Sequence, residues 1–195
     1  MKLLGRSTSG NVQKVIFLLE ELGASYERED YGKQFGNTAT AEYLAMNPNG
    51  KVPTLIDGDL VIWESNTILR YIARKSKSDL YPADFGDRTQ VERWMDWLLA
   101  SLNGAYVAIF KATKAGDEVP AAAVTEMGAA LKILEAHLAE NSYLAGENFS
   151  LADITLGPII HRCLGFPVER PSTPNVSAWH ERISGRAAFQ KAIGG

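Results

Sequence analysis

Hydroxyl and carboxylate side chains stand at the starts of two predicted helices. Ser9 lies in the segment Arg6–Gly10, just before a helical pattern over residues 11–22, and Glu64 and Ser65 start a second helical pattern. The free N–H groups and the dipole of a helix N-terminus favour an anion, and a hydroxyl placed there can donate to a thiolate or an oxyanion. The same residue types also serve as ordinary helix caps, so each segment alone is compatible with a purely structural role.

A third segment, Asn47–Pro53, comes directly before a predicted strand. A proline at the entrance to a strand removes a ladder hydrogen bond, which indicates a turn or a cis peptide bond that exposes the neighbouring backbone. The N–H and C=O groups of Val52 can then pair with an extended peptide ligand as an added strand. We expect the three segments to converge at one end of the predicted sheet.

The sulfur and imidazole groups do not favour redox or metal chemistry. A redox protein with this order of elements would carry a cysteine in the loop before the first helix, and that loop has none. The single cysteine, Cys163, lies in an apolar stretch, where we expect an inert buried thiol. With His137, His161 and His180 it lacks the spacing of zinc ligands, so we predict no metal and a reducing compartment.

Composition excludes several classes of partner. The 195 residues suffice for one ordinary domain or two small ones, and 46% hydrophobic with 22% charged residues is typical of a globular chain. The net charge is −3, and no segment gathers five or six basic residues, so nucleic acid and anionic membranes are excluded as main partners. The apolar run Val15–Leu19 is far shorter than the ~18 residues of a membrane span, so we expect a cytoplasmic protein.

The first third of the chain alternates between strand and helix patterns. The predicted strands are 2–4, 25–30, 54–56 and 60–63, and the predicted helices are 11–22, 41–46 and the segment that starts at Glu64-Ser65. Gly23 supplies a left-handed stop for the first helix, and the Asp57-Gly58 step suits a hairpin turn. The order β-α-β-α-β-β-α predicts an α/β, thioredoxin-like domain over residues 1–75.

The rest of the chain has helical spacing. Residues 76–86 are rich in Ser, Asp, Pro and Gly and predict a linker, whereas apolar stripes over 91–102 and 124–138 predict long helices. We therefore expect an all-helical domain over residues 87–195. Ser150 and Asp153 have the spacing of a capping box, so we interpret Asp153 as a structural carboxylate.

Several strings of residues together resemble a known family. They are Asn47-Pro48-Asn49-Gly50-Lys51-Val52-Pro53-Thr54-Leu55, then Asp57-Gly58, then Glu64-Ser65-Asn66-Thr67-Ile68-Leu69-Arg70-Tyr71, the helix start Ser150–Ile154, and a closing segment around Trp179 and Arg186–Phe189. On these strings, the chain resembles the cytosolic glutathione transferases over essentially its whole length, and among them the serine-type, bacterial theta- or beta-like members.

The resemblance implies a homodimer of two-domain chains that binds glutathione as co-substrate in the thioredoxin-like domain. It also implies that Pro53 follows a cis bond and that the Val52 backbone pairs with the cysteinyl part of glutathione. Glu64 and Ser65 would hold the γ-glutamyl ammonium and carboxylate, and Lys51 would face the glycyl carboxylate.

For the hydroxyl that activates the thiol, the resemblance implies a serine. The serine-type pattern has this residue fourteen positions before the glycine that ends the first helix, which is Ser9 here. Ser7 and Thr8 compete for the role. The common serine-type pattern has a second Ser or Cys followed by Arg where this chain has Gly10 and Asn11. Whether Asn11 also takes part in activating glutathione is therefore left open.

A hydrophobic electrophile would bind against the helical domain. The candidates there are Tyr106, Phe110 and Trp97, with the loop residues Phe35 and Phe166 as further ones. Each of the three helical residues is also compatible with an ordinary core or dimer contact.

The predicted function is a glutathione S-transferase. A different class is a binding or assembly module that keeps this fold without transferase activity, and the presence of Val52, Pro53, Glu64 and Ser65 argues against it. A glutathione-dependent isomerase or peroxidase is a third alternative. The serine-rich loop with a following Trp-Arg that is usual in isomerases is absent from the sequence.

Overall fold

A computed structural model describes residues 1–194 of the chain. They form two compact units, of which the first is Met1–Tyr81 together with the segment from Gly185 onward, and the second is Pro82–Ser184. The sequence predicted the end of the chain within the helical domain, whereas this division groups it with the thioredoxin-like unit. The contacts of its last helix, described below, are the physical reason.

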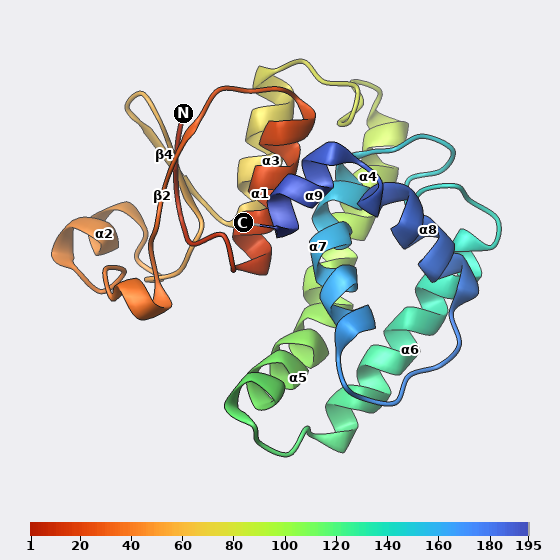
Figure 1. The fold of residues 1–195 in the computed structure, drawn as a ribbon. Helices are drawn as coiled ribbons and strands as arrows, with labels where there is room; N and C mark the ends of the chain where they lie inside the picture. Colours follow the sequence, from red (N-terminus) through yellow and green to blue (C-terminus); the bar gives the residue numbers. More distant parts are fainter. Residues whose placement is uncertain (195) are drawn as a thin grey trace. The chain divides into compact units, whose positions relative to one another are not determined.

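A mixed four-stranded sheet forms the centre of the first unit (Figure 1). Its strands are β1 (Lys2–Leu4), β2 (Glu27–Glu29), β3 (Thr54–Asp57) and β4 (Leu60–Trp63), in the spatial order β2-β1-β3-β4. β1 is parallel to β2 and antiparallel to β3, and β3 and β4 form the predicted hairpin, with Gly58 at φ 62° in its turn. β2 is shorter than the strand predicted over 25–30.

The helices of the first unit are α1 (Gly10–Glu21), the 3-10 turn η1 (Lys33–Phe35), α2 (Ala41–Met46), α3 (Ser65–Lys75) and α9 (Ala187–Ile193). α1 packs against both α3 and α9 (Figure 1). It ends as predicted at Gly23, whose φ of 60° accompanies hydrogen bonds from Gly23 N to Glu20 O and from Ala24 N to Leu19 O. The predicted βαβαββα order and the thioredoxin-like fold are confirmed.

α9 docks on α1 through one apolar and one ionic contact. The Phe189 ring meets Phe17 edge to face at a centroid distance of 5.3 Å, and the Arg186 guanidinium forms an ion pair with Glu21. The seven-residue helix α9 is too short to be stable alone, so this packing holds it in place.

The second unit consists of helices, as predicted. They are α4 (Phe85–Trp97), η2 (Leu98–Leu102), α5 (Asn103–Ala115), α6 (Ala121–Leu138), α7 (Leu151–Gly165) and α8 (Pro174–Ser184). The apolar stripe over 91–102 runs through α4 into η2, a π-helical turn that leads directly into α5. At the start of α7 the predicted capping box of Ser150 and Asp153 is present. Among residues 1–194, no helix has both the length and the apolar character needed to span a bilayer.

Candidate functional site

The register of the sheet brings the three segments singled out in the sequence to one end of it. Leu4, the last residue of β1, pairs with Thr54, the first residue of β3, and Thr54 pairs with Trp63, the last residue of β4. The segment that follows β1, the segment that precedes β3 and the segment that follows β4 therefore emerge at the same end. The expected convergence is confirmed.

Gly5 allows the first two of these segments to approach each other closely. It has φ 158°, and a Cβ atom added there would lie 2.5 Å from Val12 Cγ2 and 3.3 Å from Val52 Cβ. Any larger residue would push the segment after β1 away from both neighbours. The backbone of this segment thus lies directly beside Val52.

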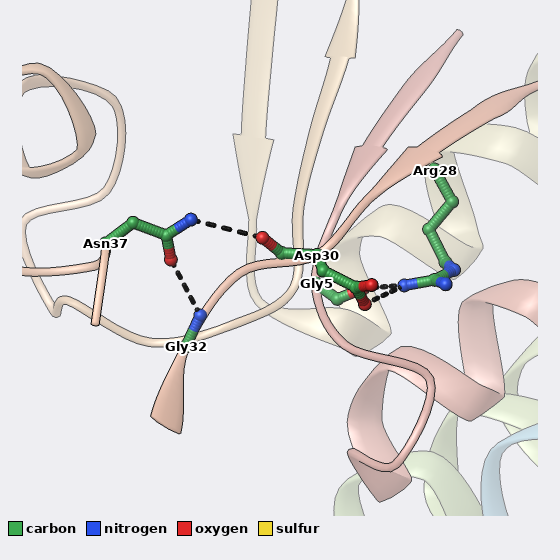
Figure 2. A network of polar contacts seen from close by, with 5 residues as sticks. All are labelled: Gly5, Arg28, Asp30, Gly32 and Asn37. Atoms are coloured by element: carbon green, nitrogen blue, oxygen red, sulfur yellow. Dashed lines mark hydrogen bonds and ion pairs between the residues drawn. The ribbon is translucent and has the colours of Figure 1, made fainter. Parts of the chain in front are cut away.

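Polar contacts brace the same end of the sheet from the side of β2 (Figure 2). Arg28 Nη1 donates to Gly5 O at 2.9 Å, and its guanidinium also forms an ion pair with Asp30. The Asn37 side chain holds the segment between β2 and η1, because Nδ2 donates to Asp30 O at 3.1 Å and Oδ1 accepts from Gly32 N at 3.0 Å. The segment after β1 is therefore held by contacts distant in the sequence.

Ser9 occupies the N-cap position of α1, but its side chain makes no capping hydrogen bond. Thr40, Asp84 and Ser150, by contrast, accept backbone N–H bonds at the starts of α2, α4 and α7. Ser9 is only 9% exposed and stands beside a helix start that carries no acidic residue. Its hydroxyl is thus not used as a cap, next to N–H groups that favour an anion.

The competing residues near Ser9 have different surroundings. Ser7 is half-buried, whereas Thr8 and Asn11 are exposed. Ser9 is thus the most buried of these hydroxyl-bearing and amide-bearing side chains.

The segment before β3 is held by a buried polar network. Tyr43 Oη and Asn47 Nδ2 donate to Lys51 O at 2.7 and 2.8 Å, and Asn47 Nδ2 also donates to Thr54 Oγ1 at 3.1 Å. These bonds anchor the residues on both sides of Val52. The Val52–Pro53 peptide bond is cis, as the resemblance implies, and the Lys51 side chain is exposed.

Glu64 has an unusual backbone conformation at the start of α3. Its φ is 69° and ψ is 114°, a region that non-glycine residues rarely adopt and that is often associated with functional sites. The exposed Glu64 side chain makes no capping bond, and Ser65 beside it is 5% exposed. As at α1, the helix start is not closed by the side chain at its N-cap.

Lys14 is a residue that the sequence reasoning missed. It is 1% exposed on α1, in the midst of its apolar positions, and burial lowers the pKa of its ammonium to about 7 while the charge of Glu64 acts in the opposite direction. The sequence signal was a lysine between Val12 and the continuous apolar run Val15–Leu19 of this helix. A buried cation thus lies under the electrostatic influence of the start of α3.

The aromatic candidates are found in different surroundings. Tyr106 and Phe110 stack at a ring-centroid distance of 6.0 Å within the second unit. Phe166, which is distant in the sequence, also stacks on Tyr106. Trp97 packs edge to face on Trp94 instead, at 5.3 Å. Phe35, in η1 of the first unit, is exposed.

The sulfur and imidazole groups lie in the second unit. Cys163 is buried, and this burial raises the pKa of its thiol to about 12, which is typical of an unreactive cysteine. His161 Nδ1 and His180 Nε2 are 3.0 Å apart and share a hydrogen bond. Within residues 1–194, no cluster of three or more His, Cys, Asp or Glu side chains could hold a metal ion.

Comparisons with known proteins point to one family for both parts of the chain. Residues 1–74 match the family described as glutathione S-transferase, N-terminal domain, and residues 86–187 match glutathione S-transferase, C-terminal domain. Glutathione S-transferase GstB of Escherichia coli (strain K12) is 35% identical over 200 residues, which cover 98% of this chain and 96% of that protein. Glutathione S-transferase F10 of Arabidopsis thaliana is 34% identical, with coverage of 92% and 90%.

A solved structure agrees with these sequence relatives. The theta class glutathione S-transferase from Xanthomonas axonopodis pv. citri, with glutathione bound, is 39% identical to this chain. It superposes with a TM-score of 0.94, covering 98% of this chain and 96% of that one.

Proposed function

Because this chain belongs to the glutathione S-transferase family, we propose that it binds glutathione at the end of the sheet where the three segments meet and conjugates its thiolate to hydrophobic electrophiles. The glutathione bound in the theta class relative supports the choice of co-substrate.

One observation carries the proposal. At the two helix starts of this sheet end, α1 and α3, the side chains at the N-cap, Ser9 and Glu64, do not cap the helix. A serine at an N-cap normally stabilises a helix by accepting an N–H group of its first turn. Glu64 is unusual there in both residue type and backbone conformation, with φ 69°. Ser9 and Glu64 lie where the three segments meet, and neither makes a capping bond. Contact with a bound ligand explains their positions better than a capping role does.

Ser9 is the proposed activating residue. Its hydroxyl would donate to the glutathione sulfur, and the N–H groups at the start of α1 would add to the stabilisation of the thiolate. Each tenfold gain in thiolate over thiol corresponds to about 1.4 kcal/mol. The thiol proton passes to solvent, the sulfur forms a bond to the electrophilic carbon, and the leaving group departs with the electron pair of the bond that breaks.

The remaining residues would bind and orient glutathione. The Val52 backbone, next to Pro53, would pair with the cysteinyl amide groups, as an added strand does. Glu64 would hold the γ-glutamyl ammonium, Ser65 its carboxylate, and the exposed Lys51 the glycyl carboxylate. This orientation of the sulfur lowers the entropic cost of the reaction.

We further propose that Tyr106 and Phe110 contact the electrophile, and that the chain works as a homodimer in the cytoplasm. Two exposed apolar side chains on the same face of the edge strand β4, Val61 and Trp63, support a surface that a second copy could cover.

The test is turnover of an aryl halide with glutathione by the wild type and by Ser9→Ala, with Ser7→Ala and Thr8→Val as matched controls. We expect Ser9→Ala to lower kcat at least about tenfold and to raise the pKa of the bound thiol, with little change in glutathione affinity. An unchanged pH profile would move the role to Ser7, Thr8 or Asn11. Glutathione binding without any turnover in the wild type would favour a non-catalytic module, and turnover of peroxides or isomerisable substrates alone would favour the third alternative.

A further inference from the structure

A guanidinium contacts the aromatic cluster of the second unit. The cluster consists of Tyr106, Phe110 and Phe166, whose rings stack with Tyr106 in the middle at centroid distances of 6.0 Å on both sides. Arg162 Cζ lies 5.3 Å from the centroid of Phe110, and Arg162 Nη1 donates to Tyr106 Oη at 3.4 Å. A cation is thus held against one ring and bonded to the hydroxyl of another.

Separate elements bring this cluster together. Tyr106 and Phe110 are four residues apart on α5 and therefore share one face of that helix. Arg162 lies in the last turn of α7, and Phe166 is the residue that ends α7. Tyr106 is buried, whereas Phe110, Phe166 and the contacting Arg162 are each partly accessible.

The chemistry of the cluster suits a flat group that carries a negative charge. The rings offer stacking surface, and a guanidinium presents a planar fork of donors that matches the two oxygens of a carboxylate. Burial raises the pKa of Tyr106, so its phenol stays protonated at neutral pH and can donate while its oxygen accepts from Arg162. A hydrophobic residue at position 162 would pack against the rings without the cost of desolvating a charge, so packing alone does not explain an arginine there.

We propose that Arg162 is a specificity-determining residue that makes this cluster select aromatic electrophiles bearing a carboxylate. The proposal rests on the proposed function, in which Tyr106 and Phe110 contact the electrophile. For an aryl chloride, the glutathione sulfur bonds to the ring carbon that holds chlorine, and chloride leaves with the bonding pair. The carboxylate takes no part in these bond changes and serves recognition alone.

The test compares two aryl chlorides that differ only in charge, 4-chloro-3,5-dinitrobenzoate and 4-chloro-3,5-dinitrobenzamide. We expect Arg162→Gln to lower kcat/KM for the benzoate by about tenfold or more, mainly through KM, and to change that for the benzamide by less than about threefold. Arg162→Lys keeps the charge and should keep part of the preference for the benzoate over the benzamide. In the wild type this preference should weaken as the salt concentration is raised.

Arg170→Gln is the matched control, because this arginine is exposed in a loop of the same unit. If Arg162 only held α5 to α7, Arg162→Gln would lower the melting temperature and affect both substrates equally, which would overturn the proposal. Unchanged constants for both substrates would overturn it as well.

A binding measurement separates failure of the inference from failure of the proposed function. If the wild type turns over neither chloride, the proposed conjugation fails for this substrate class. Calorimetry with S-(4-carboxy-2,6-dinitrophenyl)glutathione and its carboxamide then decides the inference. Tighter binding of the carboxylate, lost in Arg162→Gln, supports it, and equal affinities in the wild type overturn it.

Discussion

Trp179 Nε1 donates a hydrogen bond to Asp153 Oδ1 at 2.8 Å, joining α8 to the first turn of α7. The same carboxylate accepts bonds from Leu144 N at 3.0 Å and from Ser150 N at 2.9 Å. Asp153 is fully buried, and desolvation raises its pKa while these bonds act in the opposite direction. One side chain thus connects the capping box, a preceding turn and the next helix, which agrees with the structural role predicted for it.

Replacing Asp153 with Asn should destabilise the protein without affecting chemistry. The amide keeps the volume but loses the charge and leaves a buried N–H donor unsatisfied, so we expect the free energy of unfolding to fall by about 2 to 4 kcal/mol. Urea denaturation measures this loss. Trp179→Phe removes one bond of the same network and part of a fully buried ring, so it should also lower the free energy of unfolding. Normal melting combined with lost turnover would assign the carboxylate to the reaction instead.

Ser65→Ala should weaken glutathione binding. Ser65 lies nearly buried at the start of α3, where its hydroxyl would donate to the γ-glutamyl carboxylate, and losing a hydrogen bond to a charged group costs about 1.5 to 3 kcal/mol. Isothermal calorimetry with glutathione gives the affinity directly. Ser177→Ala in α8 is the control, since that hydroxyl donates to Thr173 O, directly before its own helix. Identical affinities for Ser65→Ala and the wild type would contradict the assignment.

Lys14→Met should stabilise the protein. Because burial lowers the pKa of Lys14 to about 7 in the folded chain, the unfolded chain binds this proton more readily, and folding is disfavoured while the unfolded amine is protonated. We expect the variant to gain about 1 to 3 kcal/mol in free energy of unfolding at pH 7, measured by urea denaturation.

The pH dependence provides the control for Lys14. In the wild type, the destabilisation caused by burying Lys14 declines as pH rises from about 7 toward 10.5, the pKa of an unperturbed lysine. The difference in free energy of unfolding between the wild type and Lys14→Met should therefore narrow over this range. Lys111→Met, at an exposed position of α5, should show no such gap. A wild type more stable than Lys14→Met at pH 7 would mean that the buried ammonium has a stabilising partner.

Light scattering should give twice the chain mass of 21.3 kDa. This prediction of a homodimer follows from the family, together with the exposed apolar side chains of the edge strand β4. A dilution series down to the micromolar range tests whether the association is tight. A monomer throughout that range would contradict the prediction.

The sequence by itself determined the order of the elements and the segments that form the candidate site. These depend on local patterns: the helical spacing after Ser9, the Asp57-Gly58 turn, and the spacing of Ser150 and Asp153. Neighbouring residues decide such features, so short stretches of sequence predict them well. The string around Val52 also carried enough specific matches to identify the family.

Only the tertiary structure decided which polar side chains are used by the fold itself. Lys14 is buried because α1 packs against α3 and α9, and no local pattern indicates that the Ser9 hydroxyl leaves its helix uncapped. The contact of Arg162 with Tyr106 joins residues 56 positions apart. Such contacts arise from packing between segments that are distant in the sequence, so local sequence patterns do not predict them.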